Sequence, residues 1–112
     1  MSDRGDREFL ADIQEAAHRI ASYTAGMAYA TFLIDSRTQD AVIRNLEIIG
    51  EASKRISEQL RTDHPELPWK GMSRIRDRLI HHYFGVNLDI VWQVATPELP
   101  DVEAQIKAIL TF

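Results

Sequence analysis

Two long stretches of the chain repeat apolar residues at helical spacing, and this feature restricts the fold most. From about residue 7 to 28 the repeating positions are Phe9, Ile13, Ala16, Ala17, Ile20, Thr24 and Met27. From about residue 40 to 60 they are Val42, Leu46, Ile49, Ser53 and Ile56. Intervals of three and four residues place such side chains on one face of an α-helix. We find no strand pattern, repeat or linker, and therefore expect an all-α, up-and-down helical bundle in which residues 1–112 form a single domain.

The second stretch carries two further signals. Gly50 lies inside it and costs about 1 kcal/mol of helix stability relative to alanine, so we expect another helix to approach closely there. Asp35 and Ser36 precede it and are suitable helix caps. Its charged residues recur at helical spacing, which favours weak ion pairs on a solvated face over a catalytic role for Glu51. These charged residues are Arg44, Glu47, Glu51 and Arg55.

Composition narrows the range of functions. The 112 residues include no cysteine, which excludes disulfides and thiol chemistry. The N-terminus is charged where a signal peptide would be apolar, and no stretch is long enough to span a bilayer, so we expect a cytoplasmic protein with no membrane partner. The net charge of -4 argues against broad, non-specific binding to nucleic acid, although a local basic site remains compatible with it.

The densest group of chemically reactive side chains lies between Arg74 and Gly85. Arg76, His81 and Tyr83 form the pattern R-x4-H-x-Y, which combines a permanent cation, a group that titrates near neutral pH and a phenol. These residue types suit phosphodiester chemistry, with the nearby cations as RNA-binding residues. The RNA-binding candidates are Lys70, Arg74 and Arg78.

We expect this basic segment to form one helix that ends at Gly85, with Met72, Ile75 and Leu79 facing the core. On an ideal helix Arg76 and His81 point about 140° apart. The arginine side chain could wrap round, the helix could distort, or two copies of the chain could share a cleft. Apolar residues on two sides, Ile80 and Phe84 among them, favour a homodimer.

Neighbouring side chains refine this interpretation. Asp77 precedes His81 by four residues, so its carboxylate could orient the imidazole and stabilise its protonated form. Spacing alone also fits a solvated face with local ion pairs. His81 and His82 point about 100° apart on a helix and cysteine is absent, so we predict no metal site and no cofactor.

The segments on either side of the motif carry fewer signals. Trp69, in the proline-containing loop from Thr62 to Lys70, is expected to anchor the core or a dimer contact. Asn87 is a suitable cap for a short helix that follows Gly85. A final helix is expected after Pro97 and Pro100.

Several spaced blocks of the sequence resemble a known family. These blocks are residues 40–52, residues 67–70, residues 76–85 and residues 87–92. Together they resemble the HepT-like group of the HEPN superfamily over nearly the whole chain. The family motif is arginine, a polar residue, three variable positions, histidine, one more residue and tyrosine.

The resemblance implies a HEPN-like helical-bundle homodimer that acts as a metal-independent endoribonuclease, the toxin of a type VII HepT/MntA toxin–antitoxin system. Arg76 and His81 match its catalytic residues, and Asp77 and Tyr83 match supporting positions. Tyr83 also matches the tyrosine that the partner, an MntA-like minimal nucleotidyltransferase antitoxin, adenylylates to O-AMP-tyrosine. The implied reaction is attack by the RNA 2′-hydroxyl on the adjacent phosphorus.

Two other functions fit the same residues. The chain could be a non-catalytic helical subunit that binds a nucleotide or substrate for a minimal nucleotidyltransferase. It could also be a structural dimer whose arginines form ion pairs at the interface. RNA cleavage by the purified protein separates both alternatives from the ribonuclease.

Overall fold

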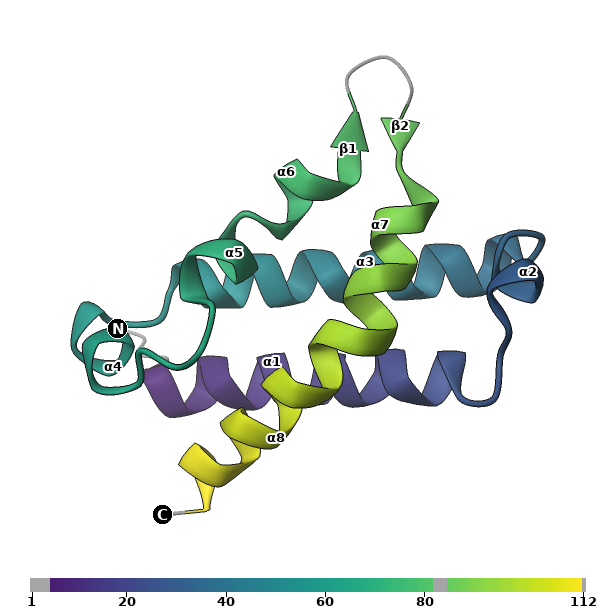
Figure 1. Ribbon diagram of the computed structural model, residues 1–112. Coiled ribbons are helices and arrows are strands. Elements are labelled where there is room, and N and C mark those ends of the chain that lie inside the picture. The colour runs from purple at the N-terminus through teal and green to yellow at the C-terminus, as the bar shows by residue number, and fades with distance from the viewer. Residues whose placement is uncertain (1–4, 82–84, 112) are drawn as a thin grey trace.

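Two long antiparallel helices form the frame of the molecule. The computed structural model describes residues 5–81 and 85–111. Helices α1 (Asp6–Thr24) and α3 (Ser36–Lys54) pack side by side, and the short helix α2 (Tyr29–Phe32) lies in the connection between them (Figure 1). Ile13, Ile20 and Leu46 are fully buried, as the helical spacing predicts. The prediction of an all-α bundle is therefore confirmed in part, because the architecture is mostly helical.

Local backbone signals set the ends of these helices. Helix α1 stops at Thr24, earlier than predicted, and Gly26 follows with a φ of 69° that favours glycine. The predicted cap Asp35 is confirmed, because its Oδ1 accepts a hydrogen bond of 3.0 Å from the Thr38 N–H. Helix α3 therefore begins at Ser36 and not near residue 40. It ends at Lys54, and a separate helix α4 (Glu58–Asp63) follows.

The C-terminal helical segment of the chain runs across the α1–α3 pair (Figure 1). It consists of α7 (Leu88–Gln93), the π-helical stretch η2 (Val94–Glu98) and α8 (Leu99–Leu110). The predicted cap Asn87 is confirmed, because its Oδ1 accepts a 3.2 Å hydrogen bond from the Ile90 N–H. The predicted final helix is confirmed as α8, although it begins at Leu99, before Pro100, and continues directly from the helical turns that contain Pro97. The chain stays helical because a widened π turn accommodates a residue that lacks an N–H.

Helix α5 (Trp69–Ser73) and helix α6 (Ile75–Leu79) pack against α3. Trp69 is buried, and its indole Nε1–H donates a 2.8 Å hydrogen bond to the His64 carbonyl oxygen, as expected of a core anchor. A Cβ atom on Gly50 would lie 3.0 Å from Ile75 Cγ2. The predicted close approach at Gly50 is therefore confirmed, and it fixes the start of α6 against α3.

A short β-hairpin interrupts the helical architecture. Strand β1 (Ile80–His81) pairs antiparallel with β2 (Gly85–Val86), with Ile80 opposite Val86 and His81 opposite Gly85. The predictions of a continuous helix to Gly85 and of a chain without strands are therefore wrong. Ile80 and Val86 are β-branched, and Gly85 has a φ of 76°, so this sequence supports a hairpin as well as a helix end.

The buried apolar residues form one continuous core between α1, α3, the α5–α6 region and the C-terminal helices. Met72, Ile75 and Leu79 belong to it, which confirms the predicted inward face of the basic segment. Within the part of the chain that the structure describes, no helix is both long and apolar enough to cross a membrane.

Candidate functional site

The basic segment is divided among several backbone elements. Arg74 lies at the break between α5 and α6, with φ and ψ of -107° and 16°. Arg76, Asp77 and Arg78 lie on α6, and all three are exposed. His81 lies on β1, two positions beyond the last residue of α6. Tyr83, together with His82 and Phe84, falls outside the described residues, so its predicted role at the site remains a prediction.

The end of α6 changes the geometry expected from the sequence. Ile80 is extended, with φ and ψ of -98° and 127°. Arg76 and His81 therefore do not lie on one helix, and the 140° angle between them does not apply. For the same reason Asp77 and His81 do not form a helical i,i+4 pair. The helix is thus interrupted between Arg76 and His81, and a cleft shared by two copies of the chain remains a prediction.

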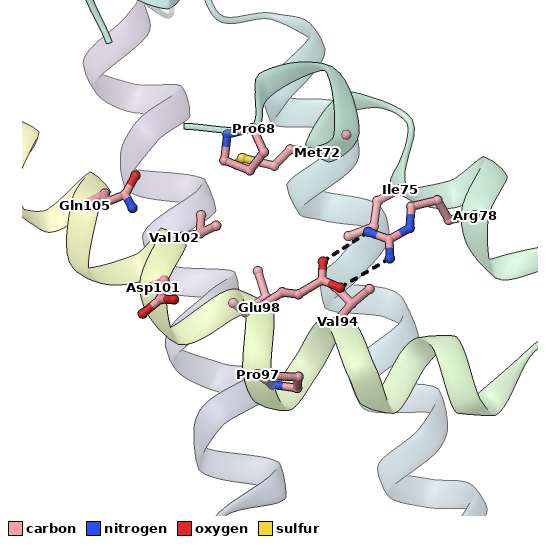
Figure 2. A pocket seen from close by; sticks show the side chains of 12 residues that line it. Pro68, Met72, Ile75, Arg78, Val94, Pro97, Glu98, Asp101, Val102 and Gln105 are labelled. Carbon is pink, nitrogen blue, oxygen red and sulfur yellow. Dashed lines mark hydrogen bonds and ion pairs between the residues drawn. The ribbon is translucent and has the colours of Figure 1, made fainter. Parts of the chain in front are cut away.

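Arg78 is tied to the C-terminal helical segment. Its Nη1 and Nη2 donate to the two carboxylate oxygens of Glu98 on η2, at 3.1 and 3.3 Å (Figure 2). This hydrogen bonding by Glu98 is the main cause of the raised pKa of Arg78. The pair flanks a pocket of about 310 Å³ that is lined mainly by apolar side chains such as Met72 and Val94. The guanidinium of Arg78 is thus already paired with the carboxylate of Glu98.

Arg76 lines a different cleft, between α3 and the α5–α6 region, which we call the Arg76 cleft. Its volume is about 260 Å³. Gly50 lies in its lining, where α3 comes closest to α6. The other residues that line it are Arg44, Glu47, Glu51 and Lys54 from α3, and Ser73 from α5. The Arg76 cleft and the Arg78 pocket share no lining residue.

The cations of the segment differ in their pairing. Neither Arg74 nor Arg76 forms an ion pair with any residue in the described ranges 5–81 and 85–111, in contrast to Arg78. Lys70 is also exposed, on α5, but neither Lys70 nor Arg74 lines the Arg76 cleft. An unpaired guanidinium can bind an anion such as phosphate through two parallel N–H donors. Arg76 has this freedom and a cleft around it.

Two parts of this arrangement were missed by the sequence analysis. Glu98, the partner of Arg78, lies 20 residues away along the chain, and no local spacing relates the two. The cleft wall on α3 contains Arg44, Glu47 and Glu51, which the helical spacing placed on a solvated charged face, and Lys54, which no sequence signal singled out. The predicted close approach at Gly50 was the available signal, because any helix that crosses there must lie beside the charged residues on either side of Gly50.

The described residues contain no group of three or more histidine, aspartate or glutamate side chains arranged to hold a metal ion. Histidine–carboxylate pairs do occur among these residues, but they lie at the surface; one example is His64 Nδ1, which lies 3.3 Å from Glu66 Oε2. The fold and site together define a small, mostly helical protein with an arginine-containing cleft.

Comparison with known proteins gives the family. Residues 13–109 match the family described as "Ribonuclease HepT-like". The chain is 44% identical to "Putative RNase MJ0127" of Methanocaldococcus jannaschii over 110 residues, which cover 98% of this chain and 91% of that protein. It is 42% identical to "Probable ribonuclease HepT" of Thermococcus cleftensis over 106 residues, covering 95% and 96%.

Each of these two alignments extends over nearly the full length of this chain and of the relative. The chain therefore belongs to the HepT-like ribonuclease family. The resemblance found in the sequence blocks is confirmed. No solved structure matches the chain significantly.

Proposed function

We propose that this protein is a metal-independent endoribonuclease in which Arg76 and His81 perform the catalysis. Membership of the HepT-like family supports a ribonuclease. The observation that carries the assignment of the site is the exposed Arg76, which lines a cleft and forms no ion pair with another described residue. A catalytic arginine must be free to receive the phosphate, and Arg76 meets this requirement better than Arg78, which is held by Glu98.

The proposed reaction needs only groups that RNA and the chain provide. The 2′-oxygen forms a bond to the adjacent phosphorus, and the bond from phosphorus to the 5′-oxygen breaks. The 2′-hydroxyl loses its proton and the leaving oxygen gains one, which gives a 2′,3′-cyclic phosphate and a 5′-hydroxyl. His81 is suited to exchange one of these protons, a contribution of roughly 10²- to 10⁴-fold.

Arg76 stabilises the negative charge that develops on the phosphoryl oxygens as the new bond forms. A positioned donor of this kind contributes roughly 10²- to 10³-fold to turnover. Asp77 supports the site as an exposed carboxylate one residue after Arg76. Lys70 and Arg74 serve as peripheral RNA-binding residues, because they are exposed and lie on α5 and at the α5–α6 break.

The test is cleavage of a labelled single-stranded RNA by the purified chain. Arg76→Ala and His81→Ala are each expected to lower turnover at least about 100-fold, since each removes one of these contributions. Arg19→Ala is the matched control, because Arg19 lies on α1 and pairs with Glu15. Cleavage should continue in EDTA and should spare DNA of the same sequence, which lacks the attacking hydroxyl. Loss of cleavage in EDTA, restored by added metal, would refute the metal-free mechanism.

We further propose that the protein is a homodimer with the β1–β2 hairpin at or near its interface. Ile80 and Val86 are paired neighbours on the hairpin and are 42% and 36% exposed, which leaves two large apolar side chains uncovered at one place. Light scattering should give twice the mass of the chain. Ile80→Glu should shift the protein towards monomer, whereas Ile34→Glu, at an exposed apolar residue before α3, should not. A monomer at micromolar concentration would exclude a shared cleft.

The partner in this proposal is an MntA-like minimal nucleotidyltransferase that adenylylates Tyr83 and so neutralises a toxin. Support comes from the resemblance of residues 76–83 to the family motif and from membership of the HepT-like family. An AMP group adds a negative phosphodiester and a bulky nucleotide, which would compete with RNA for the cations of the basic segment. Tyr83→Phe should stay active, gain no AMP mass and resist neutralisation. Unchanged adenylylation of this variant would overturn the assignment, and absence of RNA cleavage by the wild type would favour the non-catalytic binding subunit.

A further inference from the structure

The Arg76 cleft contains cations that the proposed cleavage step does not use. Arg44 and Lys54 come from α3 and line the cleft together with Arg76. Each of the two glutamates in the lining has an arginine neighbour: Nη1 of Arg44, on the same helix, lies 3.9 Å from Glu47 Oε1, and Nη2 of Arg55, the residue after α3, lies 3.2 Å from Glu51 Oε2. Lys54 forms no ion pair within the residues that the structure describes. The excess positive charge of the cleft therefore resides on Lys54 and Arg76.

These two cations come from opposite walls. Gly50 marks the point where α3 meets α6, because a Cβ atom there would touch Ile75, the residue before Arg76. Lys54 is one helical turn further along α3, which corresponds to about 6 Å along the helix axis. Lys54 therefore lies one turn from the contact between α3 and α6, on the wall of the same cleft that Arg76 lines. A phosphate at Arg76 would therefore have its neighbour within reach of the flexible Lys54 side chain.

We infer that the Arg76 cleft binds two successive phosphodiesters of a single-stranded RNA, with Lys54 holding the phosphate next to the scissile one. The inference rests on the proposed function, which places the scissile phosphate at Arg76. A cleft of about 260 Å³ has room for part of one strand. The net charge of -4 also argues against the broad basic surface that duplex binding needs. Lys54 thereby becomes a substrate-binding residue, whereas Arg78 keeps its structural pairing with Glu98.

Substitution of Glu47 should change the affinity for RNA in the opposite direction to substitution of Lys54. The Glu47 carboxylate lies in the same cleft and repels a phosphate there, so Glu47→Gln should tighten binding while Lys54→Ala weakens it. Lys107→Ala is the matched control for the lysine, because Lys107 is an exposed lysine on α8 that lines a different pocket. A general effect of net charge would make the two lysine variants equal. A site in the Arg76 cleft makes them differ.

The experiment measures the Kd of the full chain and its variants for a fluorescent single-stranded oligoribonucleotide with 2′-O-methyl groups throughout. This probe cannot be cleaved, so binding is measured separately from catalysis. Lys54→Ala should weaken binding roughly three- to tenfold at low salt, and Glu47→Gln should tighten it by a similar or smaller factor. Lys54→Ala should also reduce the slope of log affinity against log salt by about 0.7, the loss of one phosphate contact on a single strand.

The outcomes distinguish this inference from the proposed function. A Kd for Lys54→Ala within twofold of the wild type, or equal to that of Lys107→Ala, overturns the cleft assignment even if unmodified RNA is cleaved. Absence of measurable binding by the wild type overturns it as well. If binding depends on Lys54 and Glu47 as stated but unmodified RNA stays intact, the cleft assignment stands and the ribonuclease proposal fails. Circular dichroism confirms that each variant is folded.

Discussion

Replacement of Gly50 by alanine tests the contact that fixes α6 against α3. The added Cβ atom would lie 3.0 Å from Ile75 Cγ2 and 3.5 Å from the Met72 carbonyl oxygen. The first distance is shorter than ordinary van der Waals contact, so Ile75 or the helix that carries it must move. Because Arg76 follows Ile75 directly, this movement would reach the cleft.

Two opposing terms decide the size of the effect on stability. Alanine gains about 1 kcal/mol over glycine in a helix interior. Forcing an extra carbon into a packed contact costs about 1–3 kcal/mol. We expect the steric term to dominate and Gly50→Ala to lower the free energy of unfolding by about 1 kcal/mol. For a domain of this size, that loss corresponds to a fall in Tm of about 4 °C.

Gly71→Ala is the matched control. Gly71 lies in α5, and a Cβ atom there would meet nothing within 4 Å. The control should therefore gain helix propensity without a clash and raise the free energy of unfolding by up to about 1 kcal/mol. Chemical denaturation, followed by circular dichroism at 222 nm, measures both variants, and the two should change stability in opposite directions.

A double-mutant cycle identifies the contact itself. Ile75→Leu keeps the side-chain volume but removes the Cγ2 methyl group that meets the new Cβ atom. In this background Gly50→Ala should become neutral or stabilising, with a coupling energy of about 1 kcal/mol or more. The reasoning is refuted if Gly50→Ala stabilises the wild type as much as Gly71→Ala does, or if its cost is the same with leucine at position 75.

Three further predictions follow from individual contacts. Arg78→Ala should cost less than about 1 kcal/mol of stability, because its ion pair with Glu98 is half exposed, and the exchange Arg78→Glu with Glu98→Arg should recover most of that loss in thermal unfolding. Trp69→Phe should cost about 1 kcal/mol in urea unfolding, since it removes the indole hydrogen bond to the His64 carbonyl oxygen. The hydrogen bond from the Thr38 N–H lowers the pKa of Asp35 from its ordinary 3.8, so the cap stabilises the fold above that value and is lost as pH falls through the lower folded-state pKa. The difference in Tm between wild type and Asp35→Ala should therefore be present at pH 7 and shrink at strongly acidic pH, and a constant difference would contradict this account.

Local signals in the sequence predicted the frame of the fold. Apolar residues at helical spacing place Ile13 and Leu46 in the core, since a helix period and burial on one face follow from local geometry. Caps are equally local, which is why Asp35 and Asn87 were identified before the structure. Gly50 predicted a close helix approach but not the identity of the approaching residue, because that partner lies far away along the chain.

The candidate site was identified by residue type, and its arrangement was decided by tertiary structure. The R-x4-H-x-Y pattern singles out Arg76 and His81, but helix and strand compete over Ile80 and the residues after it. The helix ends where Ile80 pairs with Val86. Secondary-structure propensity alone does not specify this strand contact. Which arginine pairs with a carboxylate among the described residues was likewise set at a distance, because Glu98 reaches Arg78, whereas Arg76 lines the cleft together with Lys54.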